Sequence, residues 1–179
     1  MLHLHVIIPA HEPSGPATGS VTLTLDERRR TRLLVFLDDG REAAVQLPRG
    51  SALRDGDRLR ALEDGQIVLV SAAAESLSIA RTSDAHLLLR GAYHLGNRHV
   101  PVELGEGWLA YEHDHVLDDM VRGLGLRVET RLAPFEPEGG AFRHDGAHGH
   151  SHDVDRRHEG GHAHRHDHHD EDGSHHHHP

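Results

Sequence analysis

The fold of this chain is decided by residues 83–125, SDAHLLLRGAYHLGNRHVPVELGEGWLAYEHDHVLDDMVRGLG. Two stretches of it have apolar residues at helical spacing, and each begins with an aspartate that can cap a helix and ends at a glycine. The spaced residues are Ala85, Leu88, Leu89, Ala92 and Leu95 in the first stretch and Val116, Leu117, Met120, Val121 and Leu124 in the second. Between the two predicted helices, residues 99–104 and 108–112 are predicted to form a hairpin around Gly105-Glu106-Gly107.

Strands predicted around Leu77 and at residues 126–132 complete a β-α-β-β-α-β order, which is typical of a ferredoxin-like domain. We expect this domain to span residues 75–143. Alternation along residues 99–104 predicts that Val100, Val102 and Leu104 face the helices and that His99 lies on the opposite face, which no helix covers.

Residues 1–74 have the pattern of a small all-β barrel or sandwich, so the fold class is α+β. Strands are predicted at residues 2–8 and 21–25. Two hairpins are also predicted, 32–37 with 43–47 and 57–62 with 66–71, because Asp39-Gly40 and Asp64-Gly65 suit tight turns.

The composition favours metal ions as ligands. The 179 residues include 22 histidines and no cysteine, and the net charge is −10. A negative chain is a poor partner for nucleic acid or an anionic membrane surface. Without cysteine, any metal must bind through imidazole and carboxylate groups. No signal-like or membrane-length apolar stretch occurs, so we expect a cytoplasmic protein.

Residues 144–179 form a histidine-rich tail that contains almost no apolar residue and is therefore expected to be disordered without metal. Neutral imidazole suits Ni(2+), Zn(2+) and Cu(2+), so the composition points to a metal but not to one of these three. The predicted tail ligands are His144, His148, His150, His152, His162, His164, His166, His168, His169, His175, His176, His177 and His178.

Three further candidate ligands lie in the predicted ferredoxin-like domain. A lone histidine on a strand is more often structural than a metal ligand. His99 is a candidate because a two-fold dimer would bring two copies of it together. His113 and His115 flank Asp114 at the start of the second helix. Asp118 and Asp119 are spaced to orient the His115 imidazole, or Asp114 is only a cap and both histidines are simply exposed.

Other histidines have no comparable pattern of neighbours. For His3, His5, His11, His86 and His94 we expect structural roles.

Several motifs together resemble the UreE family of urease accessory nickel chaperones. The longest are GAYHLGNRHVP at residues 91–101 and YEHDHVLDDM at residues 111–120. LPRG at 47–50, LRDGD at 53–57 and PFEPE at 134–138 extend the resemblance along the chain.

The resemblance implies a β domain that binds partner proteins and a homodimer joined through the ferredoxin-like domain. It implies nickel at His99 in the dimer interface and further metal at His113 and His115, although Glu112 stands where relatives have another histidine. The implied partners are the urease maturation GTPase and the complex that delivers nickel to apo-urease.

We therefore predict a nickel metallochaperone and not an enzyme. One alternative is a cytoplasmic nickel or zinc storage protein, which would need the tail but not the folded domains. Another is a metal hydrolase built on His113, His115 and Asp119, for which the sequence offers no second cluster of catalytic groups.

Overall fold

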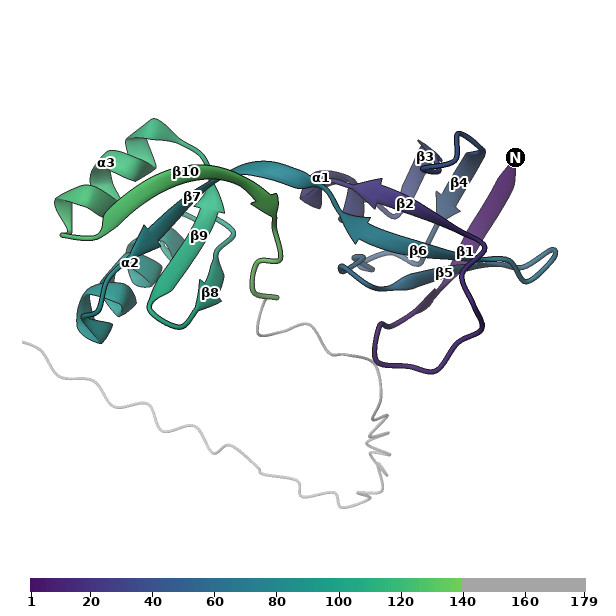
Figure 1. Ribbon diagram of the computed structural model, residues 1–179, viewed down its shortest axis with the longest axis horizontal. Coiled ribbons are helices and arrows are strands. Elements are labelled where there is room, and N and C mark those ends of the chain that lie inside the picture. The colour runs from purple at the N-terminus through teal and green to yellow at the C-terminus, as the bar shows by residue number, and fades with distance from the viewer. Residues whose placement is uncertain (140–179) are drawn as a thin grey trace, which may run out of the picture. The chain divides into compact units, whose positions relative to one another are not determined.

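The computed structural model describes residues 1–139, which contain two β-sheets and three helices (Figure 1). The N-terminal sheet is built from β1 (Leu2–Ile8), β2 (Gly19–Leu23), β3 (Arg32–Phe36), β4 (Glu42–Gln46), β5 (Arg58–Ala61) and β6 (Ile67–Ala72), with the short helix α1 (Leu25–Arg28). The C-terminal sheet is built from β7 (Ala74–Arg81), β8 (Glu103–Gly105), β9 (Trp108–Glu112) and β10 (Arg127–Pro134), with α2 (Ala85–Gly96) and α3 (His115–Gly123). The predicted α+β class is confirmed.

The N-terminal sheet curls almost into a barrel. Its strand order is β2-β6-β5-β1-β4-β3, so β2 and β3 are its edges. Asp38, which follows β3, accepts hydrogen bonds from the Ser20 hydroxyl at 2.6 Å and the Thr22 amide at 3.2 Å, both in β2. The two edges therefore approach one another around a single core. The core residues are Leu4, Val21, Leu23, Val35, Leu37, Ala43, Val45, Leu47, Leu53, Leu59, Ala61, Val68 and Val70.

Both predicted hairpins of this sheet are confirmed. β3 pairs with β4 and β5 pairs with β6, each in antiparallel orientation. Gly40 and Gly65 have φ values of 86° and 70° in the two turns, a conformation that favours glycine.

The prediction that a strand continues to Leu25 is wrong. The Thr24 hydroxyl accepts a hydrogen bond from the Glu27 amide, and the Glu27 carboxylate accepts one from the Thr24 amide at 2.9 Å. This capping box ends the extended segment and begins α1 at Leu25. The Thr-x-x-Glu spacing in the sequence could have predicted it.

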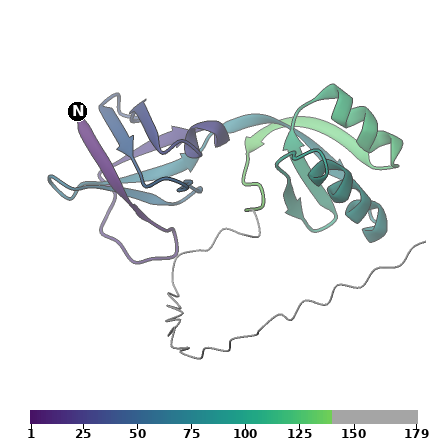
Figure 2. The same ribbon diagram turned by 180° about the vertical axis from the view of Figure 1, so that it is seen from behind.

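The C-terminal sheet is antiparallel throughout, with the order β10-β7-β9-β8. Its elements follow one another as β-α-β-β-α-β, the order predicted from the sequence. Asp84 and Asp114 cap α2 and α3 as expected. Both helices cover one face of the sheet (Figure 2), and the core between them is formed by Ala80, Leu95, Leu109, Tyr111, Val121 and Leu126.

The other face of this sheet is partly covered by the segment that follows β10. Phe135 is 1% exposed and packs with Leu77, Ile79 and Ala110. The Glu136 amide donates to the Glu103 carboxylate at 3.0 Å, so the segment is held against β8. Nothing in the sequence predicted this packing, because a single Phe between prolines carries no periodic signal. Within residues 1–139, no helix is long and apolar enough to cross a membrane.

Candidate metal site

His99 lies at the C-terminal end of α2 and not on a strand. The His99 amide donates to the Gly96 carbonyl at 2.9 Å, and the Val100 amide donates to the Leu95 carbonyl at 3.2 Å. These bonds close the helix, and His99 occupies the left-handed position that glycine usually fills in such helix ends. The predicted strand from residue 99 is therefore wrong, because the helix end extends to His99 and β8 begins only at Glu103.

The alternation predicted for residues 99–104 is correct only in part. Val100 and Val102 pack on the helix side of the C-terminal sheet, as expected. Leu104 is 49% exposed, and His99 belongs to the turn that ends α2 and not to the sheet. The His99 imidazole is instead presented to solvent beside the helix end.

The backbone of His99 is strained. Within residues 1–139 it is the only residue other than glycine with positive φ, at 57°. Residues with a Cβ atom reach this region at a cost of about 1 kcal/mol or more. Strain of this kind is concentrated at functional sites, so the outlier marks His99 as a candidate functional residue.

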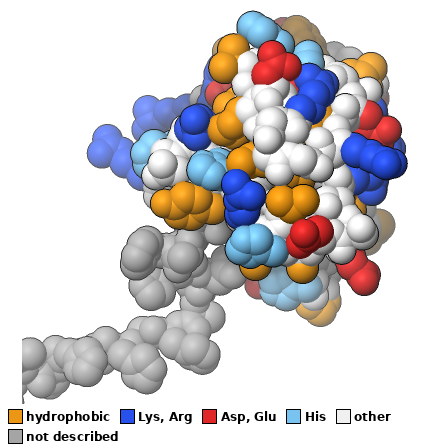
Figure 3. All heavy atoms as spheres, turned by 90° about the vertical axis from the view of Figure 1, so that its left-hand side faces the viewer, with side chains coloured by type: hydrophobic (Ala, Val, Ile, Leu, Met, Phe, Trp, Pro, Cys, Tyr) orange, Lys and Arg blue, Asp and Glu red, His pale blue; other side chains and the backbone are white. Residues whose placement is uncertain are grey.

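Exposed apolar side chains lie on the helix that ends at this turn. Leu89 and Tyr93 are 69% and 68% exposed and are one helical turn apart on α2. Figure 3, which views the structure from the left-hand side of Figure 1, shows hydrophobic and histidine side chains next to each other on the surface. The helix that presents His99 therefore also presents an uncovered apolar surface.

His113 has one ring nitrogen held by its neighbours. Its Nδ1 atom lies 3.0 Å from the Ser78 hydroxyl, 3.4 Å from the Thr130 hydroxyl and 3.5 Å from the Asp118 carboxylate. Histidine ligands in metal sites usually have one ring nitrogen fixed in this way, which leaves Nε2 for the ion. The sequence assigned Asp118 to His115, but the structure pairs it with His113, because Asp118 faces the sheet while His115 is exposed.

The Asp118 carboxylate is itself firmly positioned. It is 2% exposed, and it accepts a hydrogen bond from the Tyr111 hydroxyl at 2.9 Å and another from Arg122 at 3.3 Å. Burial and the adjacent carboxylate hold the pKa of Tyr111 well above its usual value, so this hydroxyl remains a donor. Nearby, amide hydrogen bonds from Leu117 and Val116 lower the pKa of the capping Asp114.

The candidate ligands are only partly brought together. His113 and His115 flank the cap of α3, whereas His99 lies at the end of α2. Within residues 1–139, the only three His, Asp or Glu side chains that gather closely enough to hold one ion are His3, His5 and Glu63. The sequence missed this group, because Glu63 is distant from the histidines along the chain. The predicted tail ligands, His144 to His178, lie outside the described residues.

Both halves of the chain match known protein domains. Residues 4–73 match the N-terminal domain and residues 75–178 the C-terminal domain of the UreE urease accessory protein. Urease accessory protein UreE from Pseudomonas putida strain W619 is 57% identical over 132 residues, which cover 74% of this chain and 82% of the relative. The proteins of the same name from Alkalilimnicola ehrlichii and Vibrio parahaemolyticus are 54% and 53% identical, over 72% and 74% of this chain and 78% and 84% of their own.

The class of protein defined by these matches is an accessory chaperone and not an enzyme, so the hydrolase alternative is wrong. The chain belongs to the UreE family of urease accessory proteins.

Proposed function

We propose that this protein is a cytoplasmic nickel metallochaperone that binds Ni(2+) through His99 and passes it on during urease maturation. Its recipients in this proposal are the urease maturation GTPase and the apo-urease complex. The observation that carries the proposal is the strained and exposed placement of His99 at the end of α2. Neutral imidazole is a good ligand for Ni(2+), and an exposed ligand permits the exchange that delivery requires.

The transfer site in this proposal is completed by a second copy of the chain. One exposed histidine offers a single donor atom, which is too few to hold an ion. A two-fold interface over Leu89 and Tyr93 would bury apolar surface and bring two His99 side chains together. The proposed homodimer is thus supported by the same helix that carries the ligand.

His113 and His115 form an auxiliary site in the proposal, and the tail histidines collect ions for transfer. The hydrogen bonds at Nδ1 of His113 support its role as a ligand through Nε2. The many tail imidazoles can exchange ions readily, since neighbouring histidines compete for each one.

The test is a nickel titration of four chains: the full chain, a chain ending at Arg143 and the His99→Ala variant of each. We expect the shortened chain to bind one ion per dimer between its two His99 side chains, besides any ions at its other sites. His99→Ala should lose that ion in both lengths, while the full-length variant keeps the tail's capacity. Nickel retained at the interface in a shortened His99→Ala chain would contradict the assignment.

The specific alternative is a nickel or zinc store, favoured by 22 histidines in 179 residues. Urease activation distinguishes the two functions. A store depends on capacity, so loss of the tail would impair activation more than His99→Ala. A chaperone depends on the transfer site, so His99→Ala would impair it more. Competition between Ni(2+), Zn(2+) and Cu(2+) in the same titration assigns the metal.

A further inference from the structure

His3 and His5 point to the same side of β1, away from the core of the N-terminal sheet. Leu4 is paired with Ala61 and Val6 with Arg60, so His5 is an extra residue on β1, a β-bulge. Leu2, Leu4 and Ile7 face the core, and the three-residue step from Leu4 to Ile7 reflects the bulge. The two half-buried imidazoles lie nearly parallel, with ring centroids 6.2 Å apart and an interplanar angle of 12°. Bulges often redirect side chains at functional positions.

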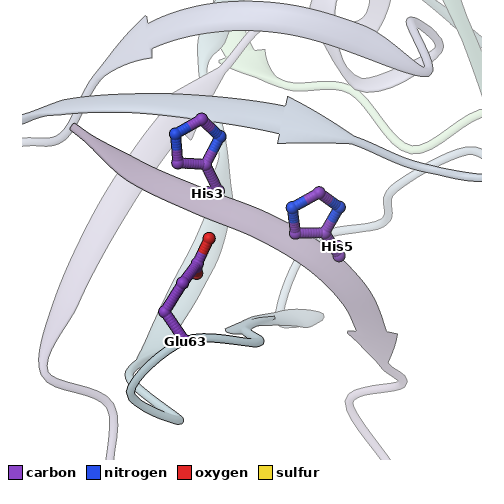
Figure 4. Close-up of side chains that lie close together, drawn as sticks. All are labelled: His3, His5 and Glu63. Carbon is purple, nitrogen blue, oxygen red and sulfur yellow. The ribbon is translucent and has the colours of Figure 1, made fainter.

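Glu63 reaches the same place from the turn between β5 and β6. The pairing of Leu4 with Ala61 puts this turn beside β1. The turn is held by Asp64, which accepts a hydrogen bond from the Gln66 amide at 3.0 Å, so Glu63 is not needed for that purpose. No ion pair within residues 1–139 engages the Glu63 carboxylate. Figure 4 shows Glu63 extending from the turn toward the strand that carries the two histidines.

We propose that His3, His5 and Glu63 form a binding site for a divalent transition-metal ion on the N-terminal sheet. One donor atom from each side chain lies within 4.8 Å of the others. Donors on one zinc ion are roughly 3–4 Å apart, given bond lengths of about 2.0–2.2 Å. Closing the site therefore requires side-chain movements on the order of 1 Å, which the exposed Glu63 can make without moving the strand.

The donor set indicates which ions the site takes. Two imidazoles and one carboxylate suit Zn(2+) and Ni(2+), and disfavour the hard cations Mg(2+) and Ca(2+), which prefer oxygen ligands alone. Three protein ligands leave at least one position for water or for a ligand from another molecule. The site uses neither His99 nor the tail, so it is independent of the proposed transfer site.

The test is Ni(2+) titration of the ¹⁵N-labelled full chain, followed by amide NMR, in which a bound paramagnetic ion broadens only nearby signals. Ni(2+) is added past the point at which the tail signals cease to change. We expect the signals of residues 2–6 and 62–65 to disappear. In Glu63→Gln, these signals should disappear only at a Ni(2+) concentration at least roughly tenfold higher. Even a group that only orients a metal ligand contributes about 10–100-fold to affinity. The double variant His3→Gln/His5→Gln should keep these signals.

Matched variants make the outcome specific. His11→Gln removes an exposed histidine of the same sheet domain that is not part of the group, and should behave as the unmodified chain. His99→Ala should also leave the broadening of β1 unchanged, which separates this site from the proposed transfer site. The proposal is overturned if the signals of β1 persist at saturating Ni(2+), or if they disappear at the same concentration in His3→Gln/His5→Gln.

Discussion

The buried Asp118 carboxylate lies 3.5 Å from Nδ1 of His113, although the two residues belong to α3 and to the segment before it. Asp118 also accepts a hydrogen bond from the hydroxyl of Tyr111. Because Tyr111 belongs to the core of the C-terminal sheet, this core sets the position of the Asp118 carboxylate. The orientation of an exposed imidazole is thereby coupled to buried structure. This coupling has a measurable consequence for metal binding.

Replacing Asp118 with Asn should weaken metal binding at His113 by about 10–100-fold, because the imidazole loses the charged group that orients it. The measurement is the Zn(2+) concentration that shifts the His113 ring signals in NMR of the full chain. Asp119→Asn is the matched control, since Asp119 also contacts Arg122 but is 78% exposed and does not contact His113. Equal affinities in the two variants would contradict the coupling.

The left-handed backbone of His99 predicts that His99→Gly does not destabilise the fold. Glycine adopts this conformation freely, so relief of strain offsets its greater entropy in the unfolded chain, and the net change should be between zero and a gain of about 1 kcal/mol. Urea unfolding measures it. His94→Gly, the same change inside α2, should cost roughly 1 kcal/mol. Similar losses in both variants would show that His99 is not strained.

Gly105 in β8 has no room for a side chain, because a Cβ atom there would overlap the indole ring of Trp108. Gly105→Ala should displace this ring and cost about 1–3 kcal/mol, the usual range for overpacking. Trp108 is the only tryptophan, so the emission maximum of the native protein reports the displacement directly. Gly123→Ala, at the end of α3, has nothing within 4 Å of the added Cβ and should leave the emission unchanged without any loss of stability.

The capping box at the start of α1 predicts that Thr24→Ala lowers the free energy of unfolding by about 1 kcal/mol, because the Glu27 amide loses its acceptor. Urea denaturation gives this value. Thr24→Ser retains the hydroxyl and should recover most of the loss. An equal loss with serine would mean that the threonine methyl group, and not the cap, is responsible.

The Asp114 cap predicts acid sensitivity of α3. Hydrogen bonds from the Leu117 and Val116 amides lower the pKa of the Asp114 carboxyl group in the folded state. The cap therefore stabilises α3 fully at pH values above the unfolded pKa near 3.8, and this stabilisation is lost as the pH falls through the lower folded pKa. Amide hydrogen exchange of Val116 between pH 5 and pH 2 measures this. Asp114→Ser retains a cap that does not titrate and should remove this pH dependence, whereas an unchanged profile would assign it to another group.

The elements of the fold were predictable because their signals are local. Helical spacing and an aspartate at the first turn identified α2 and α3, and Asp-Gly pairs identified both hairpins of the N-terminal sheet. The errors occurred at the ends of elements. Leu25 and His99 were both assigned to strands. Alternation of apolar and polar side chains does not show where a helix begins or ends, because this depends on which groups pair with the free amides and carbonyls of the helix end.

By itself, the sequence determined the order of the strands and of α2 and α3, the histidines available as ligands and the resemblance to the UreE family, since each depends on residues close together in the chain. The tertiary structure alone decided that Asp118 contacts His113 and that Glu63 joins His3 and His5. Both depend on how one element lies against another. A bulge at His5 and the burial of Asp118 shift which side chains meet, and neither has a local signature.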